Sequence, residues 1–418
     1  MKVFKFGGAS LNSVERIKNV SEILRSYKDE PLLLVMSAVG KTTNALEKVV
    51  EAFYAGNKET AISLFQAVKQ SHITTAKYLL VTSYNKTFDI LHSFFTEVEW
   101  LLHDKPIQPF DYYYDQVVCI GELLSSCIVS AYLNEKGIIN EWIDVRDIIR
   151  TDNNFRDANI CWQETMENIR RAGIQNKNTI YVTQGFIGST DQNESTTLGR
   201  EGSDYTAAVF ANLLEATNLT IWKDVEGVMS ADPKIFPTAC LINELSFNEV
   251  IEMAFYGAQV IHPKTIKPLQ NKKITLQVKS FLDPSLPGTT ISDKASKNLP
   301  PVIVLKNKQA LVHLQTQDFS FIGEKPMSRL YKLFAELNIK PNLIQTAAIN
   351  LQFCLDDREE KIQQLAAMAS EIFDVQIEKD LTLLTIRHYN EELLFEMIQG
   401  KDVVLSQKTK ETVQVLYR

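Results

Sequence analysis

The sequence predicts an α/β fold built on a largely parallel sheet, followed by smaller α+β units. Over residues 1–290, short apolar strand patterns alternate with helical patterns, which is the order of βαβ units. Strand-like segments at 180–183 and 219–222 each run into a loop rich in Gly, Asp, Ser or Thr, where open α/β sheets bind their ligands. Prolines gather at 283–301 and indicate a domain boundary.

Length and composition indicate a multidomain globular protein. At roughly 150 residues per domain, 418 residues make two or three domains. Hydrophobic residues are 45% and charged residues 23% of the chain, which supplies material for buried cores and excludes general disorder. The net charge of −7 would repel phosphate backbones over most of the surface, so we expect no nucleic-acid partner.

The sequence predicts no membrane segment, signal peptide or disulfide framework. Uninterrupted apolar runs, such as 32–36, are far shorter than the roughly 20 residues of a membrane helix, so we expect no membrane partner. The N-terminus lacks the apolar core of a signal peptide, and we expect a cytoplasmic location. Five scattered cysteines and six histidines show no metal-binding spacing, which favours reduced thiols and no protein-built metal site.

In the first 290 residues, periodicity defines the elements in order. Residues 3–6 form a short strand, apolar residues from 14 to 27 recur at helical spacing, and 32–36 has the continuous apolar pattern of a strand buried on both faces. This order predicts a βαβ unit. Residues 44–103 carry helical patterns too long for a simple crossover, which predicts an added helical layer or lid.

Beyond the boundary, we expect a second domain at 301–418, after a first domain at 1–290. The periodicity predicts helices at 327–337 and 359–373 and a strand at 381–386. The order of elements then repeats in shorter form. This predicts two α+β units of similar plan, at roughly 305–375 and 376–418, with an interleaved arrangement left open.

Two glycine-containing stretches could bind an anion. Lys5–Ser10 (KFGGAS) ends a strand ahead of a helix, where glycines let backbone N–H groups approach an anion and the lysine neutralises phosphate oxygens. A tight turn with a surface lysine explains a lone Gly-Gly pair better. Met36–Asn44 (MSAVGKTTN) follows a buried strand, but a nucleotide-triphosphatase P-loop needs glycine where Val35 stands, so that motif is excluded. Loop formation alone explains its hydroxyl residues.

Two further stretches combine charges with glycine or proline. Thr196–Ala208 (TTLGREGSDYTAA) sets Arg200 and Asp204 among glycines before a helix, which joins a bidentate carboxylate binder and an acidic group in one turn. A helix cap at Ser203 or Asp204 with a surface arginine explains it equally well. Trp222–Lys234 (WKDVEGVMSADPK) holds acidic residues that alone are best explained as turn formers.

Together, and in this order, the four stretches resemble the amino-acid kinase superfamily and, within it, the aspartokinases. The resemblance covers essentially the whole chain and includes Gly121-Glu122, Gly185–Gly188 (GFIG) and Phe255–Pro263 (FYGAQVIHP). It implies an amino-acid kinase-like three-layer sandwich, followed by tandem ACT-like regulatory domains. The residues that depart from the family's pattern are Glu201, Lys223, Gln259 and Asn342.

The resemblance implies transfer of the ATP γ-phosphoryl group to the side-chain carboxylate of L-aspartate, giving 4-phospho-L-aspartate. This is the first step of the aspartate-derived pathway to lysine, threonine and methionine. Mg²⁺ would arrive with ATP. No general base is needed, because the carboxylate is ionised at neutral pH. The resemblance further implies feedback by lysine or threonine and a homodimer formed through the ACT-like domains.

The resemblance also assigns roles to individual residues. Lys5 and Asp204 are the catalytic pair, in which Lys5 neutralises the transferring phosphoryl group and Asp204 orients Lys5. The residues assigned to the acceptor are Ser37, Thr43, Glu122 for the ammonium group and Arg200 for a carboxylate. The residues assigned to ATP are Lys5, Gly7, Gly8, Ala9, Lys223, Asp224, Met229, Lys234 and Gln259.

Two alternatives stay open. Another kinase of the superfamily, such as glutamate 5-kinase or N-acetylglutamate kinase, would share the glycine-rich opening but not the tandem C-terminal units. A catalytically weakened amino-acid sensor on the same fold is the second. The presence of Lys5, Glu122, Arg200 and Asp204 argues against the sensor. The departures at Glu201 and Gln259 favour it.

Overall fold

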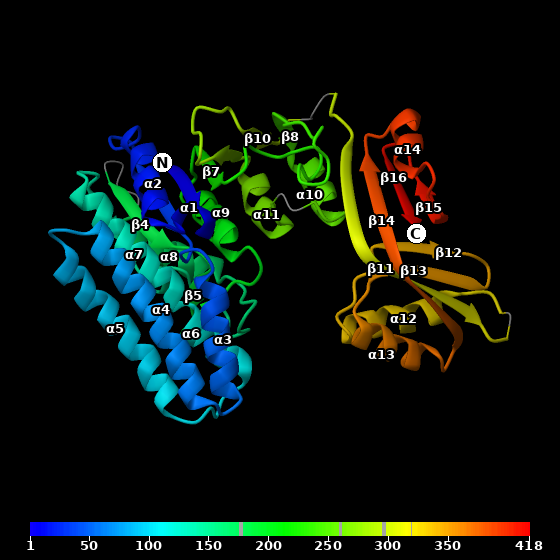
Figure 1. Cartoon of the computed structure of the whole chain (residues 1–418), viewed down its shortest axis with the longest axis horizontal. Helices are drawn as coiled ribbons and strands as arrows, with labels where there is room; N and C mark the ends of the chain where they lie inside the picture. Colours follow the sequence, from blue (N-terminus) through cyan, green and yellow to red (C-terminus); the bar gives the residue numbers. More distant parts are fainter. Residues whose placement is uncertain (175–178, 259–260, 295–297, 319) are drawn as a thin grey trace. The chain divides into compact units, whose positions relative to one another are not determined.

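The computed structural model describes residues 1–174, 179–258, 261–294, 298–318 and 320–418. They form two compact units (Figure 1). The first holds Met1–Val228, Leu241–Ile251 and the described residues of 261–294. The second holds Met229–Cys240, 252–258 and the described residues from 298 onward. Two short segments that precede the expected boundary therefore belong to the C-terminal unit.

The first unit is built on an eight-stranded, mostly parallel sheet. Its strands are β1 (Lys2–Phe6), β2 (Leu32–Met36), β3 (Asn140–Trp142), β4 (Ile180–Gln184), β7 (Asn218–Lys223), β8 (Glu244–Ser246), β9 (Thr275–Ser280) and β10 (Thr289–Ser292). The order is β3-β4-β2-β1-β7-β9-β10-β8, in which the β9–β10 pair is antiparallel. β2 is buried along its whole length, as its apolar run predicts. The predicted α/β sheet is confirmed.

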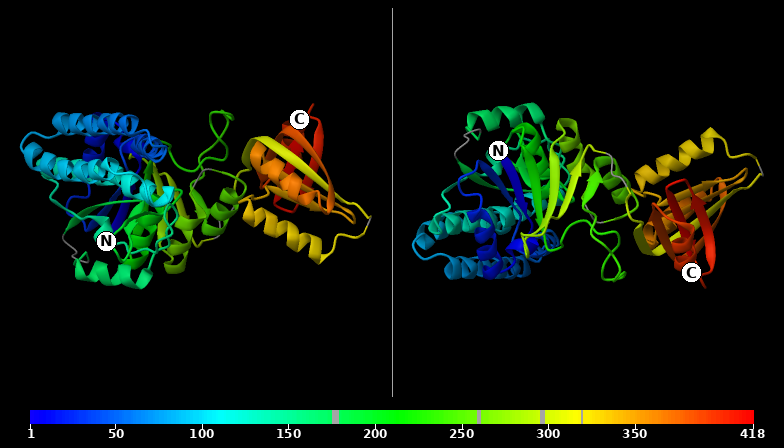
Figure 2. Two further views of the ribbon diagram at one scale, coloured as in Figure 1. Left: turned by 90° about the horizontal axis from the view of Figure 1, so that it is seen from below. Right: turned by 90° about the horizontal axis from the view of Figure 1, so that it is seen from above.

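Helices pack against this sheet and against one another. They are α1 (Gly8–Leu11), α2 (Val14–Arg25), α3 (Thr42–Tyr54), α4 (Lys58–Leu79), α5 (Tyr84–His103), α6 (Phe110–Val118), α7 (Ile120–Glu135), α8 (Trp162–Arg171), α9 (Gly202–Leu213), α10 (Phe247–Phe255) and α11 (Pro263–Lys272). α9 packs on β1 and β7, and α7 packs on β2 and β4. α3, α4 and α5 lie side by side (Figure 2), so the helical layer predicted for 44–103 is confirmed.

The stretch Phe110–Glu135, which contains α6 and α7, is long and apolar enough to cross a membrane. However, 89% of its most apolar 18-residue window is buried inside the protein. α7 contacts α4, α5 and three strands of the sheet. The apolar composition of α7 is thus that of a helix in the protein core. The short uninterrupted apolar runs in the sequence did not predict an apolar stretch as long as Phe110–Glu135.

Apart from Met229–Cys240 and 252–258, the described part of the second unit is one antiparallel six-stranded sheet with helices packed on it. Its elements are β11 (Val302–Thr316), α12 (Glu324–Glu336), β12 (Leu343–Thr346), β13 (Asn350–Asp356), α13 (Glu359–Ala369), β14 (Phe373–Arg387), α14 (Glu391–Ile398), β15 (Val403–Lys408) and β16 (Thr412–Tyr417). The order is β12-β13-β11-β14-β16-β15. β11 and β14 pair along most of their length, and each contributes to both halves of the sheet. The two α+β units are interleaved.

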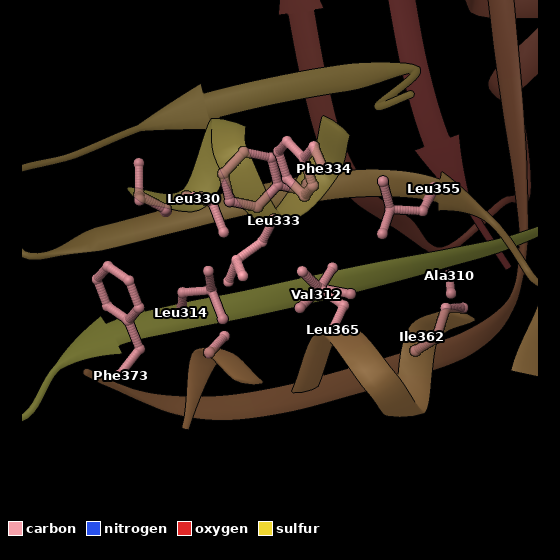
Figure 3. Close-up of a cluster of buried hydrophobic side chains, with 13 residues drawn as sticks. Ala310, Val312, Leu314, Leu330, Leu333, Phe334, Leu355, Ile362, Leu365 and Phe373 are labelled. Atoms are coloured by element: carbon pink, nitrogen blue, oxygen red, sulfur yellow. The ribbon is translucent and has the colours of Figure 1, made fainter. Parts of the chain in front are cut away.

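Each half of this sheet has its own core. In the first half, α12 and α13 cover side chains such as Val312, Leu314 and Leu355 (Figure 3). The expected helix at 359–373 was too long, because it ends at Ala369 and Phe373 instead opens β14. The strand expected at 381–386 was correspondingly too short. Alternating apolar residues from Phe373 to Ile377 pack on the first core, which extends the strand backwards.

Candidate active site

A pocket of about 430 Å³ lies where β1 and β2 end, beside the start of α9. The carboxyl ends of parallel strands meet at one edge of a sheet, so the loops after them converge there. The pocket is lined by Lys5, Gly8, Ser37, Ala38, Gly40, Thr43, Tyr114, Glu122, Arg156, Phe186, Thr197, Gly199, Arg200, Glu201, Gly202, Ser203 and Asp204. The structure thus brings together both expected catalytic residues and all four residues expected to bind the acceptor.

Lys5 and Asp204 form a buried ion pair in this pocket. Lys5 lies near the end of β1 and Asp204 in the first turn of α9. Their Nζ and Oδ1 atoms are 2.6 Å apart, with only 13% and 5% of the two side chains exposed. Burial raises the pKa of Asp204, but the charges of Lys5 and Lys223 outweigh burial and hold that pKa below its usual value. Asp204 is therefore ionised and holds the Lys5 ammonium at the pocket.

The Gly-Gly turn after β1 packs closely on the loop after β2. A Cβ atom on Gly8 would lie 2.8 Å from the carbonyl oxygen of Gly40 and 2.9 Å from that of Ala38. These contacts are with backbone atoms, so no side chain fits there. The Gly40 N–H donates a hydrogen bond to the Gly8 carbonyl oxygen. Glycine at position 8 thus lets two pocket-forming loops touch.

Glu122 is a buried carboxyl group with spare hydrogen-bonding capacity. Its Oε1 accepts a hydrogen bond from the Ala38 N–H at 3.4 Å, whereas its Oε2 has no hydrogen-bond partner among the described residues. Burial raises the pKa of Glu122 to about 8. Ser37 lies beside it, and Ser125 donates a hydrogen bond to the Ser37 carbonyl oxygen at 2.6 Å. The pocket therefore presents an acidic group that a cation would ionise.

The loop that carries Arg200 has two residues in the left-handed region, Gly199 (φ +74°) and Glu201 (φ +54°). Arg200 between them is exposed at the pocket. Glu201 departs from the family's pattern, and its carboxylate accepts a hydrogen bond from the His262 N–H at 2.9 Å. The substitution thus ties the loop to the start of α11.

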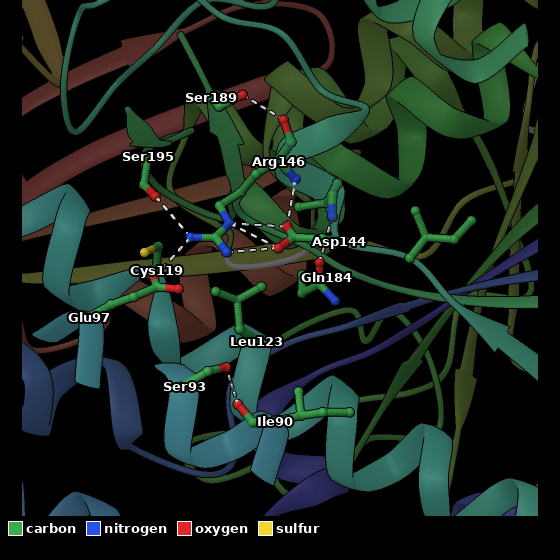
Figure 4. Close-up of polar contacts among 12 residues, drawn as sticks. Ile90, Ser93, Glu97, Cys119, Leu123, Asp144, Arg146, Gln184, Ser189 and Ser195 are labelled. Carbon is green, nitrogen blue, oxygen red and sulfur yellow. Dashed lines mark hydrogen bonds and ion pairs between the residues drawn. The ribbon is translucent and has the colours of Figure 1, made fainter. Parts of the chain in front are cut away.

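A partly buried arginine network supports the hairpin that leads into this loop (Figure 4). The hairpin consists of β5 (Ile187–Ser189) and β6 (Ser195–Thr197). Arg146 pairs with Asp144 at 2.8 Å and also reaches Ser195. Ser189 donates a hydrogen bond to the Arg146 carbonyl oxygen. The network fixes both strands of the hairpin.

Sequence reasoning missed the pocket residues Tyr114 and Arg156, and it gave no role to Thr197, which lies in the stretch Thr196–Ala208. Asp115 joins them from behind the pocket wall. Its carboxylate accepts hydrogen bonds from the Thr197 N–H at 2.8 Å, the Thr197 hydroxyl at 2.7 Å and the Arg156 N–H at 3.0 Å. Burial raises the pKa of Asp115 to about 7. Tyr114, Asp115 and Arg156 lie outside every stretch that the sequence analysis singled out, whereas Thr197, Phe186 and Ser203 fall inside such stretches.

The residues expected to bind ATP are spread over both units. Lys5 and Gly8 line the pocket, Gly7 and Ala9 adjoin them, and β7, which ends in Lys223 and precedes Asp224, lies beside β1. Met229 and Lys234 belong to the second unit. Gln259 lies outside the described residues.

The pocket suits transfer of a group between anions. Basic and acidic side chains line it, with no histidine or cysteine among its lining residues. Such a site supplies charge neutralisation and positioning rather than proton abstraction. It therefore fits an acceptor that is already ionised.

Residues 1–280 match the model of the amino acid kinase family. Aspartokinase 3, chloroplastic, from Arabidopsis thaliana is 30% identical over 96% of this chain and 73% of its own length. The chain belongs to the aspartokinase branch of the amino acid kinase family. Aspartokinase 2, chloroplastic, from the same plant is 32% identical over 85% of this chain. The alignment spans 66% of that relative, just under two thirds of its length.

A solved structure supports the same assignment. Escherichia coli aspartokinase III, in complex with aspartate and ADP, superposes with a TM-score of 0.83 at 26% identity and covers 100% of this chain and 96% of that one. The same enzyme in complex with lysine and aspartate gives a TM-score of 0.81 at 26% identity and covers 100% of this chain and 95% of that one. Both the sheet with its pocket and the interleaved C-terminal unit are thus part of the aspartokinase fold.

We expect an amino acid whose ammonium group reaches Glu122 to release a proton when it binds at pH 7. Glu122 is mostly protonated in the empty pocket, because burial raises its pKa to about 8, and a nearby cation lowers that pKa. L-Aspartate should bind up to about tenfold more tightly per pH unit as the pH rises toward 8, and no more tightly above it. Calorimetry in two buffers of different ionisation enthalpy measures the release.

Glu122→Gln is the matched control, because it keeps the shape of the side chain and cannot titrate. It should show neither the proton release nor the pH dependence. Equal proton release by both proteins would contradict this assignment of Glu122.

Proposed function

We propose that the protein is an aspartate kinase that transfers the γ-phosphoryl group of ATP to the side-chain carboxylate of L-aspartate, giving 4-phospho-L-aspartate. The observation that carries the proposal is the convergence of the Lys5–Asp204 ion pair, Glu122 and Arg200 on one pocket. Its charges match a nucleotide tail and an amino acid with two carboxylates. The reaction opens a route from aspartate to further amino acids.

Lys5 neutralises charge on the transferring phosphoryl group, and Asp204 keeps its ammonium in place. The acceptor carboxylate attacks without a general base, since a carboxyl group of pKa about 3.9 is ionised at neutral pH. Catalysis therefore comes from alignment of two anions that would otherwise repel each other. A preformed cation in a largely buried site is effective because it needs no reorganisation during the reaction.

The acceptor's other groups are held by the remaining charged residues. Glu122 binds the ammonium group with its unpartnered Oε2. Arg200 binds the α-carboxylate, for which the planar guanidinium offers two parallel hydrogen bonds. Ser37 and Thr43 complete the pocket as hydrogen-bonding residues.

The nucleotide lies against the turn after β1 and the end of β7. Gly7, Gly8 and Ala9 follow Lys5 and offer backbone groups to the phosphates. The residues proposed for the rest of the nucleotide are Lys223, Asp224, Met229, Lys234 and Gln259. Among the described residues, no cluster of three or more acidic, histidine or cysteine side chains could hold a metal ion. A Mg²⁺ ion would arrive with ATP, take its ligands from phosphate oxygens and water, and neutralise phosphate charge there.

An acyl-phosphate assay tests the proposed function. With ATP, Mg²⁺ and L-aspartate, trapping by hydroxylamine should give aspartyl hydroxamate in amounts that match the ADP formed. Glutamate and N-acetylglutamate are the matched acceptors, and we expect at least a hundredfold lower kcat/KM with them, because the site pairs with both ends of aspartate. No hydroxamate with any acceptor would favour a non-catalytic sensor, and a preference for N-acetylglutamate would favour another kinase of the family.

We further propose that the C-terminal unit binds lysine or threonine and controls the kinase. The lysine-bound E. coli enzyme supports an amino-acid effector, but Asn342 departs from the family's pattern. Its amide donates hydrogen bonds to Gln309 and Asp356 and accepts one from Lys306. The Asn342 amide thus has hydrogen-bond partners at both its nitrogen and its oxygen, and it offers a cationic effector no negative charge.

Inhibition assays with each amino acid test this regulation. Millimolar lysine or threonine, alone or together, should reduce hydroxamate formation, since binding to the C-terminal unit favours a less active state. Insensitivity to both, in a protein that is active, would contradict the proposal.

We also propose a homodimer formed through the C-terminal unit, whose sheet ends in the edge strands β12 and β15. Sedimentation equilibrium would give twice the chain mass for such a dimer.

We further propose a cytoplasmic location, which cell fractionation tests. The relatives include bacterial and chloroplastic enzymes.

A further inference from the structure

Arg156 is a pocket residue that neither the sequence motifs nor the resemblance assign. Arg156 lines the pocket together with Tyr114 and Thr197. It comes from the segment between η1 (Val145–Asp147) and α8, well outside the four stretches that carry the resemblance. The pocket lining thus contains a second arginine besides Arg200.

The backbone of Arg156 is held in a conformation that costs free energy. Its φ is +68°, in the left-handed region that side chains with a Cβ rarely adopt. The buried Asp115 carboxylate holds it there by accepting the Arg156 N–H at 3.0 Å. The same carboxylate binds both polar groups of Thr197. Asp115 is therefore a positioning residue that fixes two parts of the pocket wall.

The guanidinium of Arg156 rests on aromatic rings. Its central carbon lies 4.4 Å from the ring centre of Tyr114 and 5.6 Å from that of Phe110. Such stacking fixes the plane of a guanidinium while leaving its N–H groups free to donate in that plane. The fork is thus oriented before any ligand arrives.

The present anionic partners of Arg156 are exposed and weakly held. Asp111 lies 3.1 Å away with 55% of its side chain exposed, and Glu47 lies 3.8 Å away with 37% exposed. Ion pairs of this kind contribute little to stability, because water screens them. Arg156 itself keeps 41% of its side chain exposed, so a ligand carboxylate can reach it and replace these partners.

The charge of the pocket calls for another cation. Lys5 is already paired with Asp204, and Glu122 adds a carboxyl group that becomes negative when it meets an ammonium. A dicarboxylic acceptor and a nucleotide tail bring further negative charge. Arg200 alone does not balance them.

We propose that Arg156 is a second carboxylate-binding residue, which exchanges Asp111 and Glu47 for the α-carboxylate of the acceptor and shares it with Arg200. This inference rests on the proposed function, since it names the group of the acceptor that Arg156 binds. The exchange makes Arg156 specific for acceptors with a free α-carboxylate. It is a binding role, so its loss raises the KM for aspartate more than it lowers kcat.

The test compares Arg156→Gly with Arg156→Lys in hydroxamate assays and in calorimetric binding of L-aspartate without ATP. Glycine suits the left-handed backbone, so the variant should fold. For Arg156→Gly we expect the KM and Kd for aspartate to be roughly tenfold to hundredfold higher than in the wild-type protein, with a smaller increase for Arg156→Lys. The KM for ATP should stay within about twofold of the wild-type value. Aspartate amidated at its α-carboxylate should lose this discrimination between variants.

The double variant Glu47→Gln/Asp111→Asn separates substrate binding from a structural role. It removes the competing carboxylates but keeps Arg156, so the aspartate KM should be unchanged or lower. If it raises the KM as much as Arg156→Gly does, Arg156 is only a link between helices and the proposal is overturned. An active wild-type protein with an aspartate KM unchanged in Arg156→Gly also overturns it and leaves the proposed function standing. Absence of hydroxamate in the wild-type protein overturns both.

Discussion

The buried ion pair between Lys5 and Asp204 constrains the site more than any other contact. A carboxylate with 5% of its surface exposed needs a cation beside it, because an unpaired buried charge costs several kcal/mol. α9 must therefore dock with its first turn against the end of β1. Glycines make the approach possible, since a Cβ on Gly185 would lie 2.6 Å from Ser203 and one on Gly202 would lie 2.6 Å from the Phe186 ring. Docking of α9 against β1 for this ion pair thus requires glycine at positions 185 and 202.

The walls of the pocket depend on polar groups that contact no ligand. Asp115 binds Thr197 and the backbone of Arg156, and the Arg146 network fixes the hairpin that precedes Arg200. Side chains held in this way keep their geometry without a bound substrate, which is the condition for electrostatic catalysis. Asp115 and Arg146 therefore belong to the function as much as to the fold.

The sequence predicted the parts of the protein that local patterns encode. The strands at 3–6 and 32–36 and the helical layer at 44–103 follow directly from periodicity, whereas Lys5 and Asp204 were singled out only by the family resemblance of the combined motifs. The predicted end of α13 was wrong, because Phe373 packs on the core of the first half of the C-terminal sheet and this long-range contact makes it part of β14. Arg156 was missed since its role depends on Asp115 and Tyr114, which are about 40 residues away. The raised pKa of Glu122 likewise arises from burial that only the folded chain creates.

A double-substitution cycle on the ion pair tests the account most directly. The kcat is measured with saturating ATP and aspartate for Lys5→Met, Asp204→Asn and the combined variant, each checked to be folded at the assay temperature. If Asp204 acts by holding Lys5, each single variant should lose roughly a hundredfold or more, and the combined variant should be no slower than Lys5→Met. Losses that multiply would mean that the two residues act independently, which contradicts the account.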